Sequence, residues 1–593
     1  MRRNIGIAPD DNDQLMEHMH SSKLPIPRSG LWSVTGEIDR YRHIWFAVIA
    51  LFLLGSFNGQ WQIGPDSAAY RQIGHQLATT GRYFFREDVA GLSEYHNKQG
   101  TLYPGLPLVL SGLEKLFGPG PLAPLVLMQI LSVVVLILIY RLMLYRIERW
   151  TAVCVVVGVG TNPRFLQYAN EILSDVPFLL GVVMTLLGYE WIFRAKNRRS
   201  LIKGISLIFG GLLIAAAMRP TFMILAVSVM AACLWVIVFG RVGIKTGGMG
   251  VSPVHSATKK HGRDAHATWR AGMVIGALIL SILVFRYGLD IRRKQTTGVA
   301  SGGYESRMAG KFGDFKHSIL ARIPENLGEM LEDALPMAFL GFRSNMGLIP
   351  MGEHRLGFGA MISLAVIGAG VLLARRNVLW GAFVGATVVS LAIGGPIPRY
   401  FLMILPLLLA GWGLFIHAIA IKIRTPWRAA WAMRVGLGFV LVFNIIESCN
   451  FALTQRGFSR VVDEHHHLQR IRHVGFLRAS HFGQWAGIYD LAKMIHKNVG
   501  EQEKILGPEP TILTYLSGRQ VYPPHLTVVT PENLKTVFHR ALFPVEKSRQ
   551  TFDEYDKPMA GFELAGKLRE GAVESGPVGG YRLSKIEVPF DRP

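Results

Sequence analysis

The sequence predicts a polytopic α-helical membrane protein that ends in a small soluble α/β domain. Of the 593 residues, 50% are hydrophobic, and long apolar runs recur from residue 44 to residue 449. From about residue 450 the composition becomes that of a soluble domain. Soluble folds do not need so many long apolar runs, so a water-soluble enzyme is excluded as the overall class.

We expect about 11 transmembrane helices, because that number of apolar segments approaches the length that crosses a bilayer. One of them, 151–163, is short for a crossing. The expected spans are 44–59, 122–145, 151–163, 174–193, 201–218, 221–240, 271–288, 357–374, 378–394, 399–421 and 432–449.

Basic residues cluster in short loops at one set of span ends, which predicts that these loops face the cytoplasm. The net charge of +22 therefore indicates membrane orientation. No nucleic-acid-binding motif accompanies the charge, so we expect no nucleic-acid partner. The loops carry Arg146, Arg149, Arg194, Lys196, Arg198, Arg199, Arg241, Lys245, Arg375, Arg376, Lys422, Arg424 and Arg428.

This orientation predicts the domain order. Residues 1–42 form a polar cytoplasmic tail, and 43–449 form the transmembrane domain. Its long external loops are 60–121 and 289–356, the latter with a helical run at 325–341 over a site. An odd number of crossings places 450–593 outside the cytoplasm as a soluble α/β domain.

The remaining polar segments and the cysteines give no site of their own. Segment 241–270 lacks apolar periodicity, which predicts a disordered cytoplasmic loop. Cys154, Cys233 and Cys449 lie in or beside apolar runs and are typical of buried small residues. Adjacent histidines at 465–467 point in different directions on a helix, so no metal ligand is assigned, although a divalent metal stays possible.

Within the soluble domain we expect a strand at Lys504–Leu506, a helix at Thr511–Leu516 that stops at Gly518, and a short strand into Pro523. The closing sequence GGYRLSKIEV predicts a terminal strand.

Residues 61–83 place a carboxylate, Asp66, on an amphipathic helix directly after the first span. We expect this helix to lie on the bilayer surface, with Asp66 where membrane meets water. The structural alternative is that Asp66 is only an N-cap. One face of the helix holds Asp66, Tyr70, Ile73 and Leu77, and the positions off that face include Arg71, His75 and Gln76.

Further polar residues fall at the same external ends of the spans. For any one of them the alternative is a helix cap or a charge that reaches the interface. Together they suit transfer from an anionic leaving group, because a carboxylate can take a proton while cations hold a departing phosphate. Besides Asp66 and Tyr70, the candidates are Lys98, Tyr103, Asp175, Arg219, Arg399 and Tyr400.

The order of several short motifs resembles the GT-C superfamily of polyprenyl-phosphate-sugar-dependent glycosyltransferases, in particular its bacterial protein-mannosyltransferase and aminoarabinose-transferase branch. The motifs span most of residues 40–525. They read GPDSAAYRQIGHQLATTGRY, LYPGLPLVLSGLEKLFG, NPRFLQYANEILSDVPFLL, RPT, PRYFLMILPLLLAGWGLF and YLSGR.

The resemblance implies an inverting sugar transfer at the external face of the bacterial inner membrane. Asp66 falls at the acidic position that acts as base or positions the acceptor. Asp175 and Arg399 match the acid of a Ser-Glu-Pro-type motif and an external Arg-Tyr. Many relatives carry a second acid where this chain has Ser67, and Lys98 is offset from the related lysine.

The implied partners are a polyprenyl-phosphate-linked sugar donor, the lipid bilayer, and a glycan, lipid or protein acceptor. Two other classes stay open. A lipid-linked-sugar flippase or permease predicts ionisable groups near span centres and an internal repeat of broken helices, and neither is visible in the sequence. A non-catalytic glycan-binding membrane protein keeps the architecture without a base.

Overall fold

The computed structural model describes the helical body and parts of the C-terminal region. Short gaps interrupt several of its segments, and the expected loop 241–270, residues 465–467 and Lys98 lie largely or wholly outside them. The described segments fall within 46–57, 65–83, 103–241, 267–284, 319–340, 363–395, 398–449, 492–522, 540–544 and 581–585.

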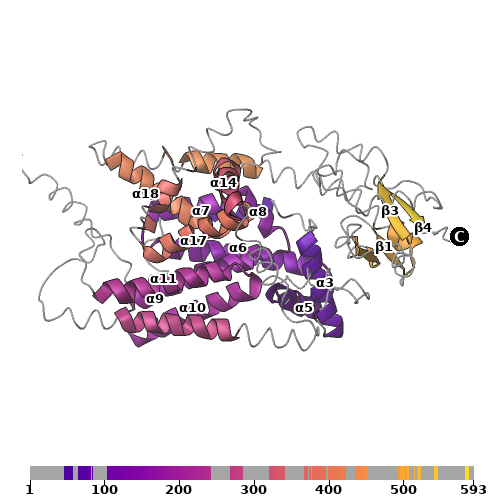
Figure 1. The fold of residues 1–593 in the computed structure, drawn as a ribbon, viewed down its shortest axis with the longest axis horizontal. Coiled ribbons are helices and arrows are strands. Elements are labelled where there is room, and N and C mark those ends of the chain that lie inside the picture. The colour runs from indigo at the N-terminus through magenta and orange to yellow at the C-terminus, as the bar shows by residue number, and fades with distance from the viewer. Residues whose placement is uncertain are drawn as a thin grey trace, which may run out of the picture.

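The body is a bundle of helices with one continuous apolar core (Figure 1). Its labelled elements are α3 Pro65–Thr80, α5 Gly105–Phe117, α6 Leu122–Met143, α7 Arg149–Gly160, α8 Pro163–Ala169, α9 Asp175–Arg194, α10 Arg198–Met218, α11 Phe222–Arg241, α14 Ile319–Glu329, the π-helix η2 Met330–Ala334, α15 Leu335–Leu340, α17 Val378–Gly394, the 3₁₀-helix η4 Pro398–Met403 and α18 Leu405–Ile421.

Four helices in the described part of the chain are long and apolar enough to cross a membrane, namely α6, α9, α10 and Ala267–Val284. Five more apolar helices are shorter, including those at Thr151–Gly160 and Gly438–Cys449. The polytopic helical class is confirmed. The count of eleven stays a prediction, because the spans expected at 44–59 and 357–374 are only partly described.

Helices α9 and α10 form an antiparallel hairpin that packs through glycines. A Cβ on Gly211 would lie 2.6 Å from Thr185 Oγ1 and 2.7 Å from the Gly181 carbonyl oxygen. A Cβ on Gly188 would lie 2.8 Å from the Gly204 carbonyl oxygen. Small residues let backbones approach closely where lipid provides no hydrophobic driving force. The hairpin therefore has a fixed register.

At the end of α9 that meets the α9–α10 turn, a buried carboxylate joins three segments. Glu190 Oε1 accepts hydrogen bonds from Arg146 Nε at 2.9 Å and Asn377 Nδ2 at 2.6 Å, and its Oε2 accepts one from Arg194 Nε at 3.2 Å. The sequence predicts both arginines as loop charges. In the structure Arg146 links Glu190 of α9 to the end of α6, and Asn377 links it to the start of α17.

The helical run expected at 325–341 is confirmed, and its assignment to an external loop over a site stays a prediction. Helices α14, η2 and α15 form one helical segment from Ile319 to Leu340. Met330, Leu335 and Phe339 are buried in the main apolar core. The segment therefore packs against the helical body through its apolar side chains.

The C-terminal region contains a four-stranded sheet of order β2-β1-β3-β4, which Figure 1 shows beyond the end of the helical body at which α3 and α5 lie. Strands β1 and β3 pair in parallel, and β3 and β4 are antiparallel. Three of the strands agree with the sequence expectations, and β3 was not expected. The strands are β1 Lys504–Leu506, β2 Gln520–Tyr522, β3 Arg540–Pro544 and β4 Tyr581–Lys585.

Replacing Gly211 with alanine tests the hairpin. We expect Gly211→Ala to lower the stability of the detergent-solubilised protein by about 1–3 kcal/mol, because the added methyl group overlaps the backbone of α9. Gly210→Ala is the matched control, since its Cβ would meet only Met184 Cε at 3.7 Å. Thermal unfolding measures both. Equal stability of the two variants would contradict the close approach.

Candidate functional site

The α9–α10 hairpin brings Asp175 and Arg219 together. Asp175 opens α9 and Arg219 follows the last residue of α10, so the antiparallel arrangement places both at one end of the pair. Arg219 Nη2 donates to Asp175 Oδ2. Both residues are buried, Asp175 at 4% and Arg219 at 8% exposure. A buried charge needs a partner of opposite sign, and here each residue provides it for the other.

Helix η4 adds a second arginine and an aromatic ring. Arg399 and Tyr400 lie in its first turn. The preceding helix α17 is capped at its C-terminus by Gly395, which has φ +100°. The Cζ atoms of Arg399 and Arg219 lie 5.4 and 5.6 Å from the centre of the Tyr400 ring. Both cations are therefore within the distance at which the ring attracts a guanidinium.

Helix α3 supplies a second carboxylate. Arg399 Nη1 donates to Asp66 Oδ2 at 2.9 Å, and the Asp66 side chain is 49% exposed. The helix begins at Pro65, a residue suited to the first helical position, so Asp66 lies inside the first turn. The N-cap alternative is therefore wrong. The carboxylate contacts Arg399 from another part of the chain.

Tyr70 lies behind the charged groups. Its hydroxyl is 3.2 Å from Ser174 Oγ, and the residue is 6% exposed. Burial raises the pKa of Tyr70 to about 12, although the Arg219 charge and the Ser174 hydrogen bond act in the opposite direction. The phenol therefore stays protonated and neutral at physiological pH.

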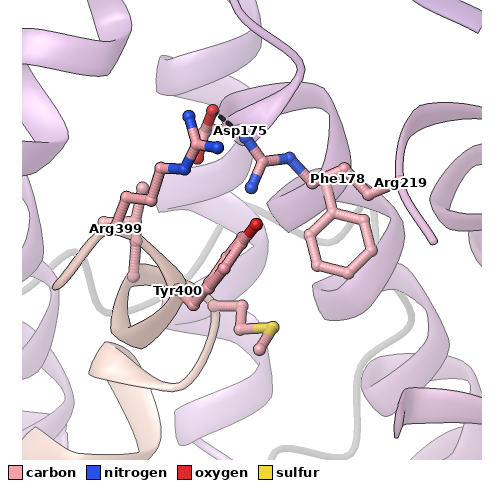
Figure 2. Close-up of a pocket in the computed structure, with 7 residues that line it drawn as sticks. Asp175, Phe178, Arg219, Arg399 and Tyr400 are labelled. Atoms are coloured by element: carbon pink, nitrogen blue, oxygen red, sulfur yellow. Dashed lines mark hydrogen bonds and ion pairs between the residues drawn. The ribbon is translucent and has the colours of Figure 1, made fainter. Parts of the chain in front are cut away.

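A pocket opens between these elements (Figure 2). It is small and partly open to solvent, and it joins the two arginines and Asp175 to an apolar wall. Arg399 Nε is buried and has no hydrogen-bond partner among the residues that the structure describes. The lining residues are Asp175, Phe178, Arg219, Arg399, Tyr400, Leu402 and Met403.

The side of α3 away from Asp66 is not free. Arg71 is 2% exposed, and its Nη2 donates to the Pro119 carbonyl and lies 4.0 Å from Glu114 Oε2. Glu114 also contacts His75 Nδ1. Helix α3 therefore packs against α5 through a buried charged residue, and its place at the bilayer surface stays a prediction.

The structure thus brings five predicted residues into direct contact or onto one pocket, namely Asp66, Asp175, Arg219, Arg399 and Tyr400. It places Tyr70 behind the pocket. Tyr103 precedes α5 and does not line the described pocket. Sequence reasoning missed Ser174, because a serine before a helix predicts an N-cap and gives no sign of a contact with Arg219.

The guanidinium groups of this site are suited to an anion. Two arginines lie beside two carboxylates, so the formal charges of the site balance, and its guanidinium donors are what a negatively charged ligand could use. In the part of the chain that the structure describes, no three His, Cys, Asp or Glu side chains form a group able to hold a metal ion. The Arg399 Nε and the two guanidiniums are suited to phosphate oxygens.

No protein-family model and no curated protein matches the sequence. Solved structures do match. ArnT from Cupriavidus metallidurans bound to undecaprenyl phosphate is 12% identical with a TM-score of 0.52, and the match covers 93% of this chain and 99% of that one. The apo form of the same protein is 12% identical with a TM-score of 0.51, and the match covers the same share of both chains.

The Archaeoglobus fulgidus oligosaccharyltransferase tethered with an acceptor peptide is 11% identical with a TM-score of 0.50, covering 93% of this chain and 75% of that one. At such identities the likeness shows the fold. The chain therefore shares the fold of ArnT and of the archaeal oligosaccharyltransferase.

Proposed function

We propose that this chain is a membrane glycosyltransferase that moves a sugar from a polyprenyl phosphate to an acceptor hydroxyl. The observation that carries the proposal is the pair of arginines, each bound to an aspartate, around one pocket. The fold supports it, since one solved ArnT with this fold is bound to undecaprenyl phosphate. The sugar and the class of acceptor, whether glycan, lipid or protein, are not assigned.

Arg219 and Arg399 are the proposed phosphate ligands. Their guanidiniums flank Tyr400, and a planar guanidinium can donate two parallel hydrogen bonds to phosphate oxygens. As the bond between the sugar and the phosphate breaks, negative charge grows on the leaving oxygen. Fixed cations lower the energy of that transition state more than that of the bound donor.

Asp66 is the proposed base. The acceptor oxygen attacks the anomeric carbon, the bond from that carbon to the phosphate oxygen breaks with its electrons, and the acceptor proton passes to Asp66. Attack opposite the leaving phosphate inverts the configuration. A phosphate leaving group needs no general acid, so one carboxylate suffices. The exposed position of the Asp66 side chain gives an acceptor access from water.

The donor phosphate and Asp66 compete for Arg399. Before the donor binds, the Asp66 carboxylate is held in an ion pair with Arg399. A phosphate that takes hydrogen bonds from Arg399 weakens this pairing. Donor binding thereby releases the Asp66 carboxylate for the acceptor.

Asp66→Asn separates the proposed role of Asp66 as the base from its competition with the donor phosphate for Arg399. We expect the transfer rate to fall by about a hundred- to ten-thousand-fold, because an amide cannot take the proton. Affinity for the donor should instead rise, on the order of fivefold or about 1 kcal/mol, because a competing negative charge is gone. Single-turnover transfer and equilibrium binding of undecaprenyl phosphate measure the two effects.

The control for Asp66→Asn is the same substitution in an Arg399→Gln background, where no change in donor affinity is expected. Transfer by Asp66→Asn at the wild-type rate would remove Asp66 as the base. Unchanged donor affinity would remove the competition for Arg399.

Arg399→Lys tests the phosphate ligand. An ammonium is a point charge without the guanidinium fork, so donor affinity should fall by about 1–3 kcal/mol while acceptor use changes little. The matched control is Arg198→Lys, because Arg198 is exposed and begins α10, at the end of that helix opposite Arg219. Steady-state KM values for donor and acceptor provide the measurement. A donor KM equal to that of the control would exclude Arg399 as a phosphate ligand.

The site and residues 450–593 are proposed to lie outside the cytoplasm of a bacterial inner membrane. The support is the positive-inside pattern of the loops at the opposite span ends. An export-dependent reporter fused after Asn450 should be active, and a cytoplasm-dependent reporter at the same position should be silent. The reverse pattern would contradict the topology and an external active site.

The two other classes predict different results. A flippase or permease would move intact lipid-linked sugar across a vesicle membrane without releasing polyprenyl phosphate. A glycan-binding protein would bind the acceptor and leave the donor unchanged. Mass spectrometry of lipid-linked sugars incubated with the purified protein distinguishes both from a transferase, which converts the donor to polyprenyl phosphate.

A further inference from the structure

Ser174 uses its hydroxyl in a way that its position before α9 does not predict. Serine at this position commonly caps the helix that follows. Here Ser174 has φ −76° and ψ −2°, and its side chain makes no capping hydrogen bond. Its Oγ instead accepts a hydrogen bond from Arg219 Nε at 3.0 Å. Since the residue is 1% exposed, this bond is shielded from water.

Ser174 and Asp175 together fix the plane of the Arg219 guanidinium. Ser174 binds Nε and Asp175 binds Nη2, and these two nitrogens form one edge of the group. The opposite edge, with Nη1, makes no hydrogen bond to another described residue. Figure 2 shows Arg219, Tyr400 and Arg399 converging on the pocket. The consecutive residues Ser174 and Asp175 thus orient the Arg219 side chain.

Tyr70 extends this contact to the helix that carries Asp66. The Tyr70 hydroxyl lies 3.2 Å from Ser174 Oγ. Tyr70 is four residues after Asp66 in α3, so the two share one face of the helix. A chain of hydrogen bonds therefore runs from the helix of the proposed base, through a buried serine, to the proposed phosphate ligand.

The anchoring of α3 does not depend on this chain. Gly74 packs against Leu110 of α5, where an added Cβ would lie only 2.9 Å from the Leu110 Cβ. Arg71 contacts Glu114 and the Pro119 carbonyl. Removing one phenol oxygen should therefore leave α3 folded against α5. What changes is the orientation of the groups at the pocket.

We propose that Ser174 and Tyr70 are positioning residues that hold Arg219 in the orientation for the donor phosphate and keep it in register with Asp66. The proposal rests on the proposed function, because it assigns Arg219 to a lipid phosphate. Neither residue contacts the reacting atoms. Tyr70 acts through Ser174, and Ser174 acts through Arg219.

The test compares Ser174→Ala, Tyr70→Phe and the double variant, with undecaprenyl phosphate as the binding probe. Each single variant should bind the probe about three- to tenfold more weakly, in line with the loss of one hydrogen bond to a charged group or its partner. The double variant should be no weaker than Ser174→Ala, since the two residues act in series. Ser174→Thr, which keeps a hydroxyl, should recover most of the affinity.

Ser132→Ala is the matched control, because Ser132 is also fully buried and, among the described residues, its hydroxyl bonds only to the Met128 carbonyl of its own helix, at 2.8 Å. It should bind the probe as wild type does, even if its melting temperature falls. Wild-type affinity in Ser174→Ala, or losses that multiply in the double variant, would overturn the proposal. Donor turnover by the wild-type protein, measured in parallel, shows whether the proposed function itself stands.

Discussion

The ion pair between Asp175 and Arg219 is the interaction on which the site depends. An isolated charge in an apolar interior is costly, whereas a paired and hydrogen-bonded one is tolerated. The glycine contacts between α9 and α10 set the register that brings the two residues to one end of the hairpin. Packing at Gly181 and Gly211 therefore determines whether the pocket has an oriented cation.

Charged groups lie at both ends of α9, and the two clusters differ in solvent exposure and in how fully their polar atoms are hydrogen-bonded. Glu190 at one end is 1% exposed and accepts hydrogen bonds from two arginines and Asn377, which satisfies it with protein groups. At the other end the Arg399 Nε has no hydrogen-bond partner in the described part of the chain, and the Asp66 side chain is half-exposed. The first cluster holds helices together, and the second keeps a guanidinium donor available, as the proposed binding of a phosphate requires.

Sequence patterns predict the helical class well, because apolar length alone determines it. They also locate Asp66, Asp175, Arg219 and Arg399, since charges at the ends of apolar spans are unusual. They do not predict which charges pair. The Asp66 to Arg399 contact spans 333 residues, and the burial of Arg71 depends on how α5 packs. The contact between Ser174 and Arg219 was not predicted, because a serine before a helix commonly bonds to a backbone N–H of that helix instead.

A structure determined with undecaprenyl phosphate is the most direct test of phosphate binding between the two arginines. The expected result is a phosphate with oxygens about 3 Å from nitrogens of both Arg219 and Arg399, with the Asp66 contact to Arg399 lengthened or lost. The contradictory result is a phosphate bound elsewhere, with the pocket empty and Asp66 still 2.9 Å from Arg399.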